Sequence, residues 1–334
     1  MTPTVPRPAT RLSPIGGIGV HTDRVNADVL GADYETRALP LGGGDTTATL
    51  VRRRARPATR GAVLYVHGFA DYFFQRHVAE HFTVRGFDFY ALDLRAYGRS
   101  LRPGQVANFV TDLAEHFEEI DAAARVIREE DGHRHLVVMG HSTGGLITSL
   151  WAHERRSDDV LDALVLNSPW LDLAEPWLLR TVGTALIRGV GRIAPRLVLK
   201  PGMGPVYGES IHRDHHGEWD FDTAWKPIEA FPVHAGWLRA IRRGHARLHR
   251  GLDVRVPVLL LRSGRSHLHA KRWTPEAMTA DTVLDVEHMR QWGPKIGGQV
   301  RIVPVEGGMH DLFLSAEPVR RRALAEVDEF LDEI

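Results

Sequence analysis

A serine at position 142 stands between two glycines in the sequence Gly140-His141-Ser142-Thr143-Gly144. An apolar run at residues 136–139 precedes it, and a helix-like stretch at residues 146–152 follows it. A G-x-S-x-G sequence between a strand and a helix is typical of a sharp turn that presents a nucleophilic serine hydroxyl. A side chain two positions before or after the serine would collide with the backbone of that turn, and glycine avoids the collision. We therefore predict that Ser142 is a nucleophile.

The same region offers hydrogen-bond donors for a negatively charged oxygen. A helix that begins beside the serine has free N–H groups and a positive dipole end, so we expect the backbone N–H of Thr143 to be one donor. The second donor should come from the loop after the third strand, which carries the sequence His67-Gly68-Phe69. Because Gly68 permits a close backbone approach, the predicted second donor is the backbone N–H of Phe69. Each such donor typically lowers a reaction barrier by roughly 2.7–4 kcal/mol.

A serine hydroxyl reacts well only when a neighbouring base takes its proton. His310 follows the last predicted strand in the sequence Glu306-Gly307-Gly308-Met309-His310. The last strands of a parallel sheet of this kind lie beside the strand that carries the serine. The paired glycines let the loop turn sharply toward the edge of the sheet. We therefore predict that His310 is the base.

The histidine in turn needs a carboxylate that fixes its tautomer and stabilises the imidazolium. The loop after the predicted strand at residues 256–261 should supply it, but residues 263–280 contain a single carboxylate. We favour Asp281 and then Asp285, which come next along the chain, and Asp172 is a third candidate. Any of these side chains could instead cap the N-terminus of a helix.

The elements that must position these residues alternate between strands and helices. Short, continuous apolar runs suit parallel strands that are buried on both faces, and helical stretches separate them, the clearest at residues 108–130. Two β-prone segments that flank a glycine turn at residues 42–44 predict an antiparallel hairpin. The pattern predicts an α/β fold with an eight-stranded, mostly parallel sheet and helices on both faces. The expected strands lie at residues 34–41, 47–53, 62–67, 87–92, 136–139, 161–166, 256–261 and 300–305.

One long segment does not fit this alternation. It falls between the sixth and seventh strands, and its apolar residues form a helical stripe. The stripe consists of Leu178, Leu179, Val182, Leu186, Val190 and Ile193. We interpret the segment as a helical cap inserted over the carboxyl-terminal edge of the sheet. The predicted parts are an N-terminal arm at 1–30, the first part of the core at 31–169, the cap at 170–253 and the second part of the core at 254–334, which ends in a helix at 318–331.

Composition excludes several classes of function. Acidic and basic residues balance at 42 each, so no net charge attracts nucleic acid. The absence of cysteine excludes disulfides and thiol nucleophiles. The spacing of His212, His215 and His216 differs from that of a zinc protease helix, and we expect neither a metal nor a cofactor. No uncharged apolar stretch of about 18 residues and no secretory apolar region occurs, which predicts a cytoplasmic protein without stable membrane insertion. The oligomeric state is left open.

Taken together, the motifs resemble those of α/β-hydrolases of the monoacylglycerol lipase and lysophospholipase kind. The matching pieces are His67-Gly68, residues 93–100, Gly140 to Gly145 and Gly307 to His310. The family carries its acid in a short Ala-Asp-x-x-x-Asp-like signature, and residues 280–285 resemble it, so the resemblance implies that Asp281 is the acid. This chain places the signature nearly twenty residues after its strand.

The resemblance also implies hydrolysis of a small-molecule acyl ester, such as a monoacylglycerol or lysophospholipid, through an acyl-enzyme. Other acyl substrates remain alternatives, namely a lactone, a thioester or an amide, including a peptide. An epoxide or haloalkane hydrolase of this fold would use an aspartate nucleophile, and Ser142 argues against that chemistry. A ligand-binding protein that keeps the fold without turnover is a further alternative.

Overall fold

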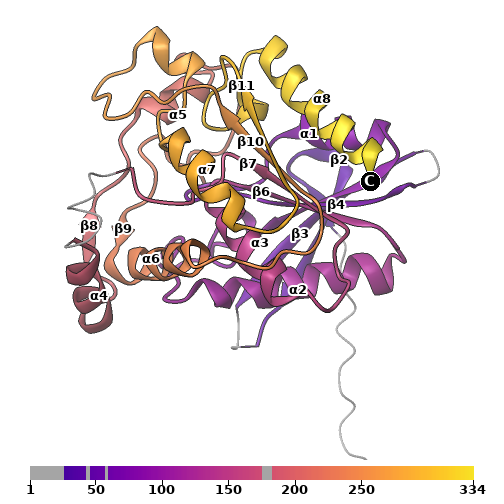
Figure 1. Cartoon of the computed structure of the whole chain (residues 1–334), viewed down its shortest axis with the longest axis horizontal. Coiled ribbons are helices and arrows are strands. Elements are labelled where there is room, and N and C mark those ends of the chain that lie inside the picture. The colour runs from indigo at the N-terminus through magenta and orange to yellow at the C-terminus, as the bar shows by residue number, and fades with distance from the viewer. Residues whose placement is uncertain (1–25, 43–45, 57–58, 175–182) are drawn as a thin grey trace, which may run out of the picture.

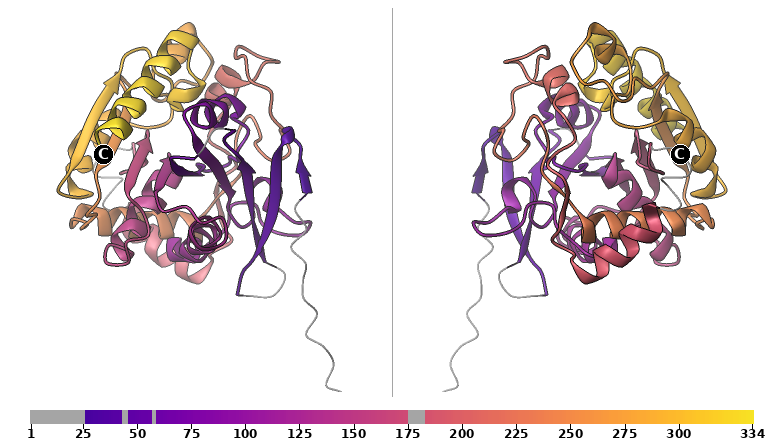
Figure 2. Two further views of the ribbon diagram at one scale, coloured as in Figure 1. Left: turned by 90° about the vertical axis from the view of Figure 1, so that its right-hand side faces the viewer. Right: turned by 90° about the vertical axis from the view of Figure 1, so that its left-hand side faces the viewer.

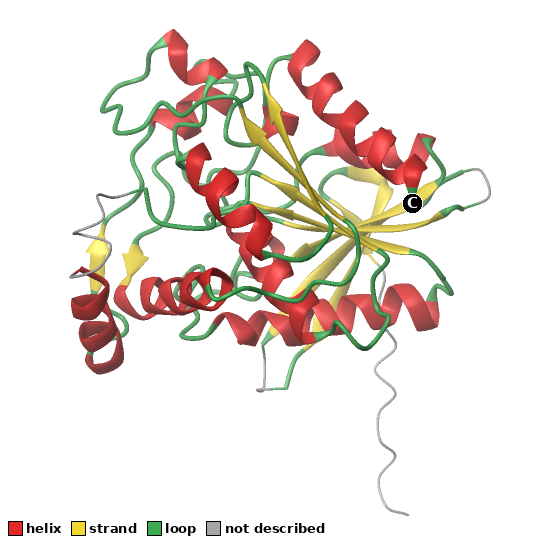
Figure 3. Cartoon of the chain, viewed as in Figure 1, coloured by secondary structure: helices red, strands yellow, loops and turns green. Residues whose placement is uncertain are grey.

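A computed structural model of the chain describes residues 26–42, 46–56, 59–174 and 183–334. In this part of the chain a twisted nine-stranded sheet forms the centre, and helices cover both of its faces (Figures 1 and 3). The strands are β1 (Asn26–Asp28), β2 (Gly31–Pro40), β3 (Thr47–Arg53), β4 (Gly61–Val66), β5 (Phe87–Asp93), β6 (Leu136–His141), β7 (Ala163–Asn167), β10 (Val258–Ser263) and β11 (Val300–Val305). The helices of this core are α1 (Arg76–Val84), α2 (Phe117–Arg125), α3 (Thr143–Glu154), α7 (Val286–Trp292) and α8 (Glu317–Glu333).

The order of the strands is β1-β2-β3-β5-β4-β6-β7-β10-β11. The first three strands pair antiparallel, β3 pairs antiparallel with β5, and all pairs from β5 to β11 are parallel. The chain therefore reverses its winding direction at β4, because β5 lies on one side of β4 and β6 on the other. In sheets of this kind ligands bind beyond the carboxyl ends of the strands at such a switch point.

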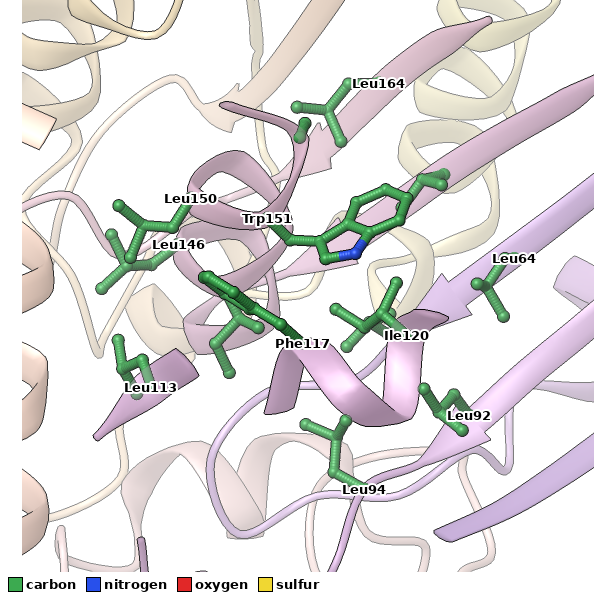
Figure 4. Close-up of a cluster of buried hydrophobic side chains, with 14 of the residues drawn as sticks. Leu64, Leu92, Leu94, Leu113, Phe117, Ile120, Leu146, Leu150, Trp151 and Leu164 are labelled. Atoms are coloured by element: carbon green, nitrogen blue, oxygen red, sulfur yellow. The ribbon is translucent and has the colours of Figure 1, made fainter. Parts of the chain in front are cut away.

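Two hydrophobic cores hold the layers together, one on each face of the sheet. Successive residues of β4 alternate between them, with Val63 in one and Leu64 in the other, as the period of two along a strand requires. On the first face Trp151 of α3 packs beside Phe117 and Ile120 of α2 over the sheet (Figure 4). On the second face α1 and α8 supply the covering side chains. The continuous apolar runs are therefore strands buried on both faces, as predicted.

The predicted α/β class and all eight predicted strands are confirmed, with ends that differ by a few residues. A ninth strand, β1, lies within the segment that we expected to be an arm. The helix predicted at 108–130 begins later, at a 3₁₀ turn over Leu113–His116 that leads into α2. Asp112 caps this turn, and Asn108 has a φ of +60°, which a helix does not accommodate.

The segment between β7 and β10 holds five further described elements. They are α4 (Thr184–Ile193), β8 (Val198–Lys200), α5 (Val206–Ile211), β9 (Val233–His234) and α6 (Ala235–His249). The helix α4 packs on α6, and β8 pairs antiparallel with β9, at one side of the molecule (Figures 1 and 2). Of the predicted apolar stripe, Leu178, Leu179 and Val182 lie outside the described residues. Ile193 ends α4 and is 86% exposed, so the stripe is not buried along its whole length.

Within the described residues, none of the helices combines the length and the apolar character needed to cross a membrane.

Candidate active site

Ser142 lies at the junction of β6 and α3, where the chain turns from strand to helix. Its backbone has φ +51° and ψ −116°, a conformation that is uncommon for residues with a Cβ atom. Two hydrogen bonds hold the turn: the N–H of Ser142 donates to the carbonyl of Asn167 at 3.0 Å, and the N–H of Trp170 donates to the carbonyl of Ser142 at 2.9 Å. The surrounding elements thus stabilise a strained backbone at the predicted nucleophile.

The glycines on both sides of Ser142 have the steric role that the sequence predicts. A Cβ atom on Gly144 would lie 2.3 Å from the carbonyl oxygen of His67, which belongs to the neighbouring strand end. A Cβ atom on Gly140 would lie 2.4 Å from the hydroxyl of Thr148 in α3. Both distances are far below van der Waals contact, so the turn requires glycine at both positions.

His310 lies between Ser142 and Asp281. Its Nε2 atom is 3.0 Å from the Oγ atom of Ser142, and its Nδ1 atom is 2.9 Å from the Oδ2 atom of Asp281. An N–H at Nδ1 donates to the carboxylate, which leaves Nε2 able to accept the serine proton. His310 is 3% exposed and Asp281 is fully buried. This is the geometry in which a histidine transfers protons for a serine nucleophile.

Asp281 reaches His310 although it follows β10 by eighteen residues. The backbone at Asp281 pairs with the segment just after β10: its N–H donates to the carbonyl of Arg265 at 3.0 Å, and its carbonyl accepts from the N–H of His267 at 2.7 Å. Residues 268–280 therefore form an excursion that leaves and returns to the end of the strand. In space Asp281 thus lies directly beside the end of β10, although it comes eighteen residues later in the chain.

The other two acid candidates lie elsewhere. The carboxylate of Asp285 accepts the N–H of Glu287 at 3.0 Å and caps α7. Asp172 forms an ion pair with Arg242 of α6 at 2.6 Å. Asp281 also accepts the N–H groups of Val283 and Leu284 through Oδ1, the oxygen that does not face His310, and so holds the bend that precedes α7.

The two predicted oxyanion donors flank the serine hydroxyl. A Cβ atom on Gly68 would lie 3.1 Å from the Cβ atom of Ser142, so the turn that carries Phe69 lies close beside Ser142. Thr143 follows Ser142 directly as the first residue of α3. Among the described residues, neither the N–H of Phe69 nor that of Thr143 has a protein acceptor. Both groups are therefore available to an oxygen of a bound molecule.

A cavity of about 510 Å³ opens above Ser142 and His310. The core supplies its floor, and the segment between β7 and β10 supplies most of its walls. These walls are largely apolar and include Ile187, Leu199, Met203, Val206, Ile228 and Trp237. A pocket of this kind suits a ligand with an apolar chain and one reactive polar group.

The polar residues that line this cavity include three, Asp71, Tyr207 and Lys226, that lie close to the predicted site residues and were not predicted from the sequence. Asp71 and Lys226 form a buried ion pair, with 2.8 Å between Oδ1 and Nζ. The ring of Tyr207 lies edge-on to that of His310, with 5.3 Å between the ring centres. Two signals in the sequence could have pointed to the pair: Asp71 follows Phe69 by two positions, and Lys226 is one of only four lysines in the chain.

Burial and neighbouring charges set the protonation of these groups. Burial by itself would raise the pKa of Asp71, but the ammonium group of Lys226 holds that pKa below its usual value. Burial and the nearby carboxylates of Asp311 and Asp71 raise the pKa of Tyr207 well above its usual value, so its hydroxyl stays neutral. Burial lowers the pKa of His141, whose ring centre is 4.9 Å from that of His310. The imidazole of His141 is therefore held in its uncharged form.

The three histidines near position 214 do not converge. The Nδ1 atom of His212 accepts the N–H of Asp214 at 3.1 Å, and the ring of His216 stacks on Trp273. In the described ranges no cluster of three or more His, Asp or Glu side chains has a metal-binding arrangement.

Comparison with known proteins gives the family of this chain. Residues 57–316 match the family model described as serine aminopeptidase, S33. A monoacylglycerol lipase of Mycolicibacterium smegmatis is 31% identical over 214 residues, which cover 63% of this chain and 71% of the lipase.

Solved structures with the same fold include two further lipases. The first is the monoacylglycerol lipase of Paleococcus ferrophilus, with 23% identity and a TM-score of 0.59 over 85% of this chain and 99% of the other. The second is a soluble variant of the monoglyceride lipase of Saccharomyces cerevisiae in complex with a substrate analog, with 16% identity and a TM-score of 0.62 over 88% and 94% of the two chains. Identities this low show the fold alone. The chain therefore belongs to the serine aminopeptidase S33 family, as an α/β-hydrolase similar to monoacylglycerol lipases and other carboxylic ester hydrolases.

Proposed function

We propose that this protein hydrolyses small-molecule carboxylic esters through an acyl-enzyme formed on Ser142. The observation that carries the proposal is the continuous hydrogen-bonded arrangement of Ser142, His310 and Asp281 at the floor of an apolar cavity. Ester hydrolysis by this arrangement needs no cofactor, since all its proton transfers take place between side chains, the substrate and water.

In the first step Ser142 Oγ attacks the ester carbonyl carbon while its proton moves to Nε2 of His310. The carbonyl oxygen becomes an oxyanion and accepts hydrogen bonds from the backbone N–H groups of Phe69 and Thr143. Asp281 keeps the Nδ1 proton of His310 in place and stabilises the imidazolium. The intermediate then collapses, the bond to the alcohol oxygen breaks, and His310 gives its proton to the leaving alcohol.

In the second step a water molecule takes the place of the alcohol. His310 accepts a proton from the water as its oxygen attacks the carbonyl carbon of the acyl-enzyme. The same two N–H groups hold the second oxyanion. Collapse of this intermediate releases the carboxylic acid, and the proton on His310 returns to Ser142 Oγ.

The apolar walls of the cavity favour a substrate with a medium or long acyl chain, such as a monoacylglycerol. The similarity to the lipase of Mycolicibacterium smegmatis supports the same substrate class. We further propose that residues 170–253 are the cap that forms these walls, with the two parts of the core at 31–169 and 254–334. A cytoplasmic location remains a prediction.

Labelling with a fluorophosphonate probe tests the nucleophile. The wild-type chain should be labelled on Ser142, and Ser142→Ala should abolish labelling and lower kcat by a factor on the order of 10⁴ to 10⁶. Ser149→Ala is the matched control, because Ser149 is a buried serine of α3 whose hydroxyl donates to the carbonyl of Gly145. This control should be labelled like the wild type, and a wild-type chain that stays unlabelled would refute the proposal.

A series of p-nitrophenyl esters with increasing acyl length tests the substrate class. We expect kcat/KM to rise from the acetate to the medium-chain esters, because burial of each additional methylene group contributes about 0.8 kcal/mol of free energy. An amino-acid p-nitroanilide serves as the amide substrate, and faster cleavage of the anilide than of every ester would favour the amide alternative instead.

A further inference from the structure

The turn that presents the Phe69 N–H belongs to no helix or strand. It lies between β4 and α1, and Ala70 within it has a φ of +49°, in the left-handed region that residues with a Cβ atom rarely adopt. Side chains hold this conformation: the N–H of Ala70 donates to Oδ1 of Asn108 at 3.1 Å, and the N–H of Gly68 donates to Oδ2 of Asp71 at 3.4 Å. The direction of the Phe69 N–H therefore depends on where these side chains are fixed.

Asp71 is itself fixed by a residue of the segment between β7 and β10. Nζ of Lys226, in the loop between α5 and β9, donates to Oδ1 of Asp71 at 2.8 Å, and both side chains are buried. The ammonium group also lies over the rings of Phe74, Tyr207 and Phe221, 5.5–5.8 Å from their centres. A cation held against three aromatic rings has little freedom, so it gives Asp71 a fixed partner.

The same segment makes a second contact with the turn. The ring of Phe69 packs against the ring of Trp237 in α6, with 4.2 Å between the ring centres. Phe69 is thus held through its own side chain on one side and, through Asp71, by Lys226 on the other. Both contacts come from residues that lie more than 150 positions later in the chain.

We propose that Lys226 is a positioning residue for the oxyanion site: through Asp71 it sets the turn that aims the Phe69 N–H at the developing oxyanion. The inference rests on the proposed ester hydrolysis. It makes the segment between β7 and β10 part of the catalytic geometry as well as the wall of the cavity. Lys226 does not touch the reacting atoms, and its effect passes entirely through the carboxylate of Asp71.

A thionoester substrate separates this role from a purely structural one. Donors that are aimed at an oxyanion favour an oxygen ester over the matched thionoester, in which a larger sulfur atom carries the negative charge. The experiment compares kcat and KM for a p-nitrophenyl ester and its thionoester with the full-length wild type, Lys226→Met and Lys226→Arg. Lys226→Met keeps the apolar stem and removes the charge, whereas the guanidinium of Lys226→Arg still donates to Asp71.

We expect Lys226→Met to lower kcat for the oxygen ester by a factor of about 10 to 100, below the full loss of one oxyanion donor, with KM changed less than about threefold. The preference for the oxygen ester over the thionoester should fall by a similar factor, and Lys226→Arg should restore most of it. An unchanged preference in folded Lys226→Met would overturn the proposal.

The double variant Asp71→Asn/Lys226→Met covers the case in which an unpaired buried Asp71 prevents folding. It leaves no charge at the pair, and it should also lose the preference for the oxygen ester because the side chain at position 71 has lost its anchor. A folded double variant with wild-type preference would overturn the proposal independently of the single variant.

The matched control is Asp172→Asn/Arg242→Met, which removes another ion pair of this segment, the one between Asp172 after β7 and Arg242 of α6. That pair does not touch the turn of Phe69, so the variant should keep the preference for the oxygen ester even if it is less stable. Loss of the preference in this control as well would assign the effect to general loosening of the segment and would overturn the specific role of Lys226.

A wild-type chain without activity on either ester would refute the proposed function itself, and labelling of Ser142 reports on that separately.

Discussion

The helices α3 and α4 have opposite surroundings although both are rich in small and apolar residues. In α3, which follows Ser142, every residue from Thr143 to Ala152 is buried. In α4, Ile193 is 86% exposed, and Gly189 has no atom within 4 Å of the position that a Cβ would occupy. The core thus encloses α3 on all sides, whereas the outer face of the segment between β7 and β10 is open.

This difference matches what each region has to do. A displacement of about 1 Å can cost a catalytic group 10²-fold in rate, so Ser142 as the proposed nucleophile needs a close-packed environment. The walls of an apolar pocket act through their area and tolerate looser packing. At Lys226 and Trp237 the two regions meet, because there the open segment contacts the turn of Phe69.

The largest expected effect tests whether Asp281, rather than Asp285, is the acid of the site. Asp281→Asn should lower kcat by a factor of about 10⁴, because an amide no longer fixes the histidine tautomer that the reaction needs. Asp285→Asn is the control; the asparagine still caps α7, so kcat should stay within about twofold and stability should change by less than about 1 kcal/mol. Steady-state kinetics and denaturant unfolding measure the two effects. The opposite order of kcat losses would assign the acid to Asp285.

The next effect compares the packing of the two regions directly. Leu64→Ala in β4 should lower the free energy of unfolding by about 2–5 kcal/mol, since Leu64 is fully buried in the first hydrophobic core (Figure 4). Ile193→Ala at the end of α4 should change it by less than about 0.5 kcal/mol. Urea denaturation followed by circular dichroism measures both. Equal losses would mean that a partner covers Ile193 in solution.

A smaller effect concerns the turn at the nucleophile. Gly144→Ala places a Cβ atom 2.3 Å from the carbonyl oxygen of His67, so the turn must shift. We expect kcat for a p-nitrophenyl ester to fall by a factor of about 10². Structures or near-ultraviolet circular dichroism of the variant should report a displaced but folded turn. Wild-type kcat would show that the core is more tolerant around Ser142 than its packing indicates.

The smallest expected effect is a gain in stability. Gly189→Ala in α4 meets no neighbouring atom, and alanine is the better helix former by about 0.5–1 kcal/mol. The variant should therefore be slightly more stable than the wild type and equally active, as thermal unfolding and ester kinetics can measure. A loss of stability would indicate that the open face of α4 is packed against something in solution.

Most of the core could be predicted from local patterns. Continuous apolar runs mark β4 to β7 because a strand buried on both faces is mostly apolar rather than alternating. The ends of elements were less accurate, as at Asn108, where a side-chain contact to Ala70 and a left-handed backbone delay the helix. The arm prediction missed β1, whose three residues carry too little pattern to mark a strand.

The sequence by itself determined Ser142 and His310 as the candidate nucleophile and base. Their signals are local, because a sharp turn admits only glycine at certain positions and a serine on such a turn needs a nearby base. It also favoured Asp281, although the distance from its strand left Asp285 and Asp172 open.

Only the tertiary structure decided which acid contacts His310 and which residues hold the turn of Phe69. Asp281 reaches His310 because its backbone pairs with residues 265–267 and closes the intervening loop. Asp71 and Lys226 meet across 155 positions of the chain. Contacts of this kind arise when separate elements pack together, and no spacing within one segment encodes them.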